Sequence, residues 1–189
     1  MSRTILFMFV TAIVFSFVVP TQAADVPDTN VTKLAESLKT WTELKAKCGG
    51  DYSYKISWSS WVGFGHETTI VVRDNKVVER RYREWSGQQV AMPIAPGGQP
   101  PKPQETSWAE KGDELGSHSK GAPLKTLDTL YGEAAKILET KLQPFQRLYV
   151  RFDGRGLLLM CAYVDTRIMD DAPMTGVRIS SIQIEAPAE

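Results

Sequence analysis

Two histidines and two cysteines are the side chains in this sequence best suited to nucleophilic or metal chemistry. His66 lies in a glycine-rich bend and His118 in a polar stretch. A zinc site needs three or four suitably spaced ligands, and no second histidine follows His66 and Glu67 at the helical offset. The nucleophile-elbow, phosphate-loop and dinucleotide motifs do not occur in the sequence. The histidines and motifs therefore predict no catalytic residue, no metal site and no cofactor.

Cys161 could act as a nucleophile only with a base, for which His118 is the candidate. Cys161 lies, however, in the most apolar run of the mature chain, residues 157–162. Burial in such a run raises the pKa of a thiol and excludes substrate. We therefore expect a structural role for both cysteines, either as a disulfide between Cys48 and Cys161 or as two buried free thiols.

Three carboxylates follow the longest predicted strand, at Asp165, Asp170 and Asp171. Oxygen ligands of this kind could bind a hard cation such as Ca²⁺. Their order does not match a calcium-binding loop, and Arg167 could neutralise one of them. Turn and helix-cap roles are the alternative.

Aromatic side chains are the remaining candidate for binding. Strict alternation puts four large side chains on one face of a strand: Tyr52, Tyr54, Ile56 and Trp58. If exposed, such a face would stack on a sugar or a peptide; if covered by the first helix, it would be core. The same question, cleft or core, applies to Trp58, Trp61 and Trp108.

Two helices are expected to position these residues. Apolar spacing at the helical period predicts the first over about residues 31–48, with Trp41 and Cys48 on its buried face, and Gly49 and Gly50 end it. The second begins after Thr126 as N-cap, and its apolar stripe continues until Pro144 stops it.

Alternating or β-branched runs predict about six strands. The turns at 74–75 and 153–156 predict hairpins, and a parity switch at Ser180 and Ser181 predicts a β-bulge in the last strand. Each half of the chain then has a helix followed by three strands. The sequence therefore predicts an α+β fold with a mainly antiparallel sheet of about six strands and two helices on one face. The helix followed by three strands would be the unit of a possible tandem repeat.

The first 23 residues have the pattern of a cleaved secretory signal. Arg3 precedes an apolar run over residues 5–19, and Pro20 and a small-residue end at Ala23 follow. The run is shorter than the roughly 20 residues of a membrane span, and no cysteine follows it for lipid attachment. We expect a single mature domain over residues 24–189, secreted or periplasmic and not membrane-spanning after cleavage; an uncleaved anchor is the alternative.

The mature chain is close to neutral, because the signal removes only Arg3 from a chain with 22 basic and 22 acidic side chains. This balance argues against a nucleic-acid partner, which would need a concentrated basic surface. The densest basic cluster is interrupted by acids and is expected to form the solvated side of a strand. It consists of Arg80, Arg81 and Arg83.

Residues from about 86 to 123 differ in character from the rest of the chain. Prolines and glycines accumulate between Pro93 and Pro103, and so many missing backbone donors disfavour a central strand. We expect a long loop insertion here, either a flexible excursion or a binding loop, with Trp108 docking back on the domain.

Four motifs carry a resemblance to a known family: residues 51–54 after the tryptophan-containing helix, 74–77 in the valine hairpin, 126–131 at the second helix start, and 156–165 in the apolar strand. With these, most of the mature chain resembles a family of uncharacterised secreted bacterial domains. The layout is also similar to β-lactamase inhibitor proteins and PepSY-type domains. This resemblance implies a helix-plus-antiparallel-sheet module and no catalytic residues.

These features together predict an exported, non-enzymatic module that binds a protein or an envelope component through its aromatic strands or its long loop. One alternative is a carrier of a small ligand or metal that uses Asp165, Asp170 and Asp171. The other alternative is a hydrolase whose catalytic residues follow none of the common patterns.

Overall fold

The computed structural model describes residues 29–61, 63–86, 105–168 and 172–185, so the expected signal at 1–23 lies outside the described residues. These ranges form two α-helices, α1 (Thr29–Lys47) and α2 (Leu127–Glu139), and a short 3-10 helix (Gly112–Glu114). The strands are β1 (Tyr52–Ser59), β2 (Gly65–Arg73), β3 (Lys76–Trp85), β4 (Glu105–Lys111), β5 (Gln146–Phe152), β6 (Leu158–Asp165), β7 (Thr175–Arg178) and β8 (Ser181–Ile184).

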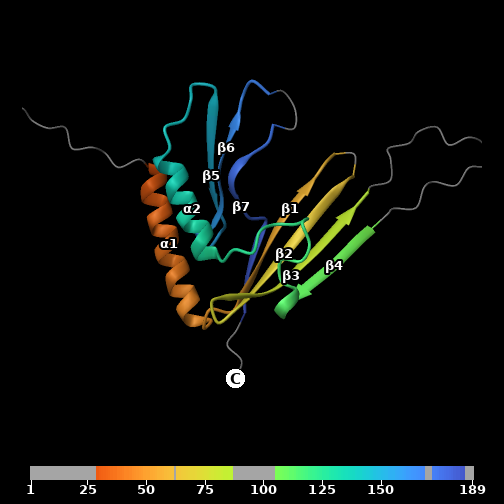
Figure 1. Cartoon of the computed structure of the whole chain (residues 1–189). Helices are drawn as coiled ribbons and strands as arrows, with labels where there is room; N and C mark the ends of the chain where they lie inside the picture. Colours follow the sequence, from red (N-terminus) through yellow and green to blue (C-terminus); the bar gives the residue numbers. More distant parts are fainter. Residues whose placement is uncertain (1–28, 62, 87–104, 169–171, 186–189) are drawn as a thin grey trace, which may run out of the picture.

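The strands form two antiparallel sheets, which confirms the α+β class (Figure 1). The first sheet has the order β4-β3-β2-β1-β8, and the second has the order β5-β6-β7. The expectation of about six strands in one sheet is thus corrected to five and three strands in two sheets. In the tandem layout, α1 precedes β1 to β4 and α2 precedes β5 to β8.

The two additional strands arise where the sequence pattern is weakest. β4 lies within the stretch expected to be a loop, so that expectation is wrong for residues 105–111; residues 87–104 lie outside the described residues. The predicted last strand divides into β7 and β8, which belong to different sheets. Ile179 N donates to Leu159 O of the second sheet, and Ser180 N donates to Lys55 O of the first. The parity switch therefore marks a change of sheet rather than a bulge within one strand.

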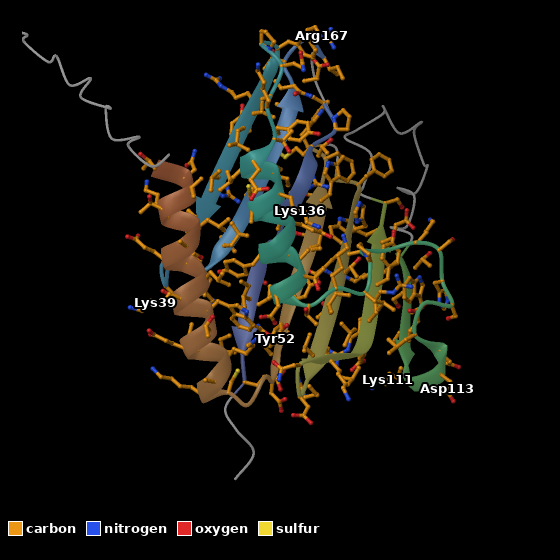
Figure 2. The ribbon with its side chains drawn as sticks, turned by 60° about the vertical axis from the view of Figure 1, so that its left-hand side comes forward. Lys39, Tyr52, Lys111, Asp113, Lys136 and Arg167 are labelled. Carbon is orange, nitrogen blue, oxygen red and sulfur yellow. The ribbon has the colours of Figure 1, made fainter. Side chains whose placement is uncertain are left out.

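The two helices lie side by side on one face and cover the second sheet together with the nearby end of β1 (Figure 1). Trp41 of α1 is fully buried and meets the Tyr52 ring edge-on, with centroids 4.8 Å apart. Figure 2 shows Tyr52 at the end of β1 near the last turn of α1. Leu127 N of α2 donates to the Tyr52 hydroxyl, and burial raises the pKa of Tyr52 to about 12. One tyrosine thereby connects both helices to the first sheet.

The buried face of α1 includes one polar residue. Leu38 is 42% exposed, whereas Ser37 is buried. The Ser37 and Tyr131 hydroxyls hydrogen-bond at 2.7 Å, and the Tyr131 hydroxyl also accepts from Leu158 N of β6. A polar side chain can therefore occupy the core face, because its hydrogen bond offsets the cost of burial.

Both cysteines are buried free thiols in the structure, which is the alternative to the expected disulfide. Cys48, directly after α1, donates from its Sγ to Lys45 O in the last turn of that helix, whereas Cys161 Sγ donates to Ala134 O of α2. Each sulfur is thus directed at a different backbone carbonyl. Burial also raises the pKa of the Cys161 thiol to about 11, so very little thiolate is present at neutral pH.

We expect a disulfide-exchange reagent to find no reactive thiol in the folded protein and two thiols per chain after unfolding, because both sulfurs are buried. The measurement is a colorimetric thiol count on protein purified without reductant. A reductant-treated sample is the control and should give the same count. A count of zero in the unfolded, untreated sample would instead show the disulfide.

Candidate functional site

A cleft opens between β1 of the first sheet and β7 of the second. It consists of two hollows of about 410 and 540 Å³ that share His66 and Arg178 in their walls. We call the two hollows together the inter-sheet cleft. Its walls include Tyr54, Ile56 and Trp58 from β1, His66 and Thr68 from β2, and Val177 and Arg178 from β7.

The cleft exists because β1 and β7 each have an edge that lacks a strand partner over part or all of its length. β1 pairs with β2 along its whole length, but it pairs with β8 only over residues 52–55. On its other side, β7 pairs with β6, and among the described residues no strand pairs with its edge toward β1. The chain crosses from the second sheet to the first at Ser180, whose N–H bonds Lys55 O of β1. From this point toward Ser59 and Thr175, β1 and β7 diverge. Two strand edges therefore border the cleft without a ladder partner.

Strand alternation identifies the backbone groups at these edges. Lys55 O and Ser57 N are bound by Ser180, so the odd-numbered residues of β1 direct their backbone groups toward the β7 side. By this alternation Ser59 N–H points to the same edge of β1, next to the cleft residue Trp58. In β7, Ile179 N bonds β6, so Gly176 and Arg178 direct their backbone groups toward β1. The cleft thus presents main-chain donors and acceptors on both sides.

A row of five rings crosses the first sheet at one end of the cleft. The rings belong to Trp58, His66, Tyr82, Trp108 and His118. Successive centroids are 5.9, 6.2, 5.2 and 4.1 Å apart, and each neighbouring pair is stacked. We call this the aromatic row. It fixes the His66 ring between Trp58 and Tyr82.

A buried ion pair lies beneath the end of the row. Arg80 binds the Glu110 carboxylate through two nitrogens, at 2.9 and 2.8 Å, and neither side chain is more than 6% exposed. The same carboxylate accepts from Gly116 N, His118 N and the Ser117 hydroxyl, and His118 Nδ1 lies 2.9 Å away. These bonds hold the pKa of Glu110 well below its usual range, with the Arg80 contact the largest cause. Arg80 is therefore not on the solvated side, unlike Arg81 and Arg83.

The segment of residues 116–125 forms the roof of the cleft, and we call it the roof segment. Arg80 donates to Ala122 O, and Ala122 N donates to Thr68 Oγ1 at 3.0 Å. At its far end, the Tyr54 hydroxyl donates to Lys125 O. The roof segment is thus attached to the sheet at several points, although the sequence predicts only a loop here.

The predicted binding tryptophans separate into three environments. Trp58 is 40% exposed and lines the cleft, so the core interpretation fails for it, whereas Tyr52 and Tyr54 are buried core residues. Trp108 docks on the sheet, as expected, and stacks on Tyr82. Trp61 is 89% exposed and belongs to neither the cleft nor the core.

The other candidate sites are not assembled within the described residues. Asp165 is held by Arg167 through two nitrogens, and Asp170 and Asp171 lie outside the described ranges. Cys161 bonds Ala134, whereas His118 bonds Glu110, so the two do not form a dyad. The described part of the chain has no group of three or more His, Cys, Asp or Glu residues that could hold a metal ion. Neither α1 nor α2, its two α-helices, is long and apolar enough to cross a bilayer.

Comparison with known proteins gives no assignment: no family model, curated protein or solved structure matches the chain. The interpretation of the site therefore depends on its geometry.

His66 and Arg178 are cleft residues that sequence reasoning does not identify. The sequence offers His66 only as a metal ligand without suitably spaced partners, and the pattern around Arg178 predicts an ordinary strand. The one usable signal is the parity switch at Ser180, because a strand that changes sheets leaves an edge unpaired where it departs.

Proposed function

We propose that this protein is an exported, non-enzymatic binding module that takes an extended polypeptide segment of another protein into the inter-sheet cleft. The observation that carries the proposal is the pair of unpartnered strand edges, β1 beyond Ser57, whose N–H is bound by Ser180, and β7 along Gly176 and Arg178. An inserted strand would form main-chain hydrogen bonds with them, as in other cases of recognition by strand addition.

The lining of the cleft also supports a polypeptide ligand. Ile56, Leu130 and Val177 offer apolar contact for alternate side chains of an inserted strand, since successive side chains point to opposite faces. Trp58 supplies exposed aromatic surface in the wall of the second hollow. Exposed strand edges are usually protected against unwanted pairing, so an edge pair left open within a concave site favours a binding role.

Ser59→Pro is expected to weaken peptide binding about tenfold, because proline removes one main-chain donor on the free edge of β1. The even-numbered residues of β1 make the bonds to β2, so pairing with β2 should remain intact. The measurement is the dissociation constant, by fluorescence anisotropy, of peptides selected from a random library on residues 24–189.

Ser59→Ala is the matched control, because it removes the hydroxyl and keeps the N–H. It should bind as tightly as the unmodified protein. Hydrogen exchange provides an independent measurement: the amides of Ser59, Gly176 and Arg178 should gain protection when peptide binds. Protection confined to other surfaces, or equal binding by both variants, would contradict strand addition in the cleft.

A further inference from the structure

Three cationic side chains line the hollow of about 410 Å³, and within the described residues one of them has no counter-charge. Lys120 pairs with Glu84 at 2.7 Å, and Lys125 pairs with Glu133 of α2. Arg178 has neither an ion pair nor a side-chain hydrogen bond within the described part of the chain. Arg178 lines both hollows and is only partly exposed. The cleft therefore contains one uncompensated positive charge at its centre.

His66 provides a second unsatisfied group beside it. His66 lines both hollows together with Arg178, and its Nδ1 is the one buried side-chain nitrogen or oxygen in the described residues that has no hydrogen-bond partner. Stacking between Trp58 and Tyr82 restricts rotation of the ring. A buried polar atom without a hydrogen-bond partner lowers the stability of the fold. A ligand that forms a hydrogen bond with this atom would recover that free energy on binding.

The surroundings increase the strength of such a bond. Ile56, Val177 and Met174 form apolar parts of the same walls, and hydrogen bonds to charged groups are stronger where water is excluded. A carboxylate suits both groups, because it accepts two bonds from a guanidinium and has a further lone pair for an imidazole N–H. A neutral amide cannot compensate the charge of Arg178.

We infer that the inter-sheet cleft recognises a carboxylate of the bound polypeptide, with Arg178 and His66 Nδ1 as its two donors. The inference rests on the proposed function and specifies the kind of segment that is bound: an extended one carrying an acidic group between apolar side chains. The carboxylate can come from an Asp or Glu side chain or from the C-terminus of the peptide.

The test uses two fluorescent peptide libraries that are identical except for Glu or Gln at a fixed central position. Each is prepared as the C-terminal acid and as the amide, so that the two sources of a carboxylate are distinguished. We expect the protein to bind peptides that carry a carboxylate about 10- to 100-fold more tightly than fully neutral ones, the effect of a hydrogen-bonded charge.

Arg178→Gln should abolish this preference, because it removes the charge and should weaken the binding of carboxylate-bearing peptides far more than that of neutral ones. Arg151→Gln is the matched control. Arg151 lies in the same row of the second sheet, with Met160 between it and Arg178, but it does not line the cleft. This variant should retain the full preference. Circular dichroism before and after heating confirms that each variant folds.

His66→Gln gives a second, independent measurement, because it changes the Nδ1 donor and retains Arg178. We expect it to reduce the carboxylate preference in part. Peptides that bind the cleft without any preference for a carboxylate would overturn this inference and leave the proposed function intact. An equal loss for charged and neutral peptides in Arg178→Gln would also overturn it. If neither library binds, the proposed function fails as well.

Discussion

Glu110→Ala should lower the free energy of unfolding by about 3–5 kcal/mol, the usual cost of removing one partner of a buried ion pair. Arg80 would remain buried beneath Trp108 without its counter-charge. The roof segment would also lose its bonds from Gly116, Ser117 and His118 to the carboxylate. Urea unfolding at neutral pH, followed by circular dichroism, measures the change.

The control is the double variant Arg80→Met with Glu110→Leu, which replaces both charges by apolar side chains of similar size. It should be considerably more stable than Glu110→Ala, because no unpaired charge is left in the core. Equal destabilisation of the single and double variants would show that the charge pair itself is not the source of the effect.

The same pair predicts a pH dependence with a defined sign. The pKa of Glu110 lies well below its usual range in the folded protein, and in the unfolded chain a glutamate has a pKa of about 4.3. Its contribution to stability is therefore complete above the unfolded pKa and is lost progressively as the pH falls below it. The stability difference between the natural protein and Glu110→Ala should accordingly be largest at neutral pH and shrink toward pH 2–3.

Trp41→Ala should also destabilise the protein by about 3–5 kcal/mol, because a fully buried tryptophan leaves a large cavity. Trp41 contacts both neighbours of α1: its ring packs edge-on against Tyr52, and its Nε1 donates to Asp128 of α2. For a domain of ordinary stability, about 5–15 kcal/mol in total, this is a large fraction. Thermal and urea unfolding both report it.

One variant separates packing from the hydrogen bond at this position, and a second, at Leu38, is the control. Trp41→Phe retains most of the aromatic volume, so its cost should be clearly smaller than that of alanine. Leu38→Ala is the control for helix α1 itself, since Leu38 is 42% exposed, and it should change stability by less than about 1 kcal/mol. A similar loss in Leu38→Ala and Trp41→Ala would contradict the assigned core.

The sequence by itself determined the local elements. The apolar period located both helices, and Thr126 accepts a bond from Thr129 N as the expected N-cap. The turn at Asp74 and Asn75 has both residues at positive φ, 52° and 62°, as a tight hairpin requires. These features follow from residues close together in the chain, whose preferences do not depend on what packs against them.

The alternation from Tyr52 to Trp58 shows where local information ends. It correctly put these residues on one face, but only the position of the helices decides that Tyr52 and Tyr54 are buried while Trp58 is exposed at the cleft. The helices cover one end of β1 and leave the other end open. No property of a single strand encodes that boundary.

Only the tertiary structure decided the candidate site. Glu110 and Arg80 are 30 positions apart, and their pairing joins β4, a segment with a weak strand pattern, to β3. The inter-sheet cleft arises because β7 and β8 join different sheets, so β1 and β7 separate beyond Ser180. His66 and Arg178 line the same two hollows although 112 positions separate them in the chain. Such proximity depends on how whole sheets pack, which nearest-neighbour patterns in a sequence do not specify.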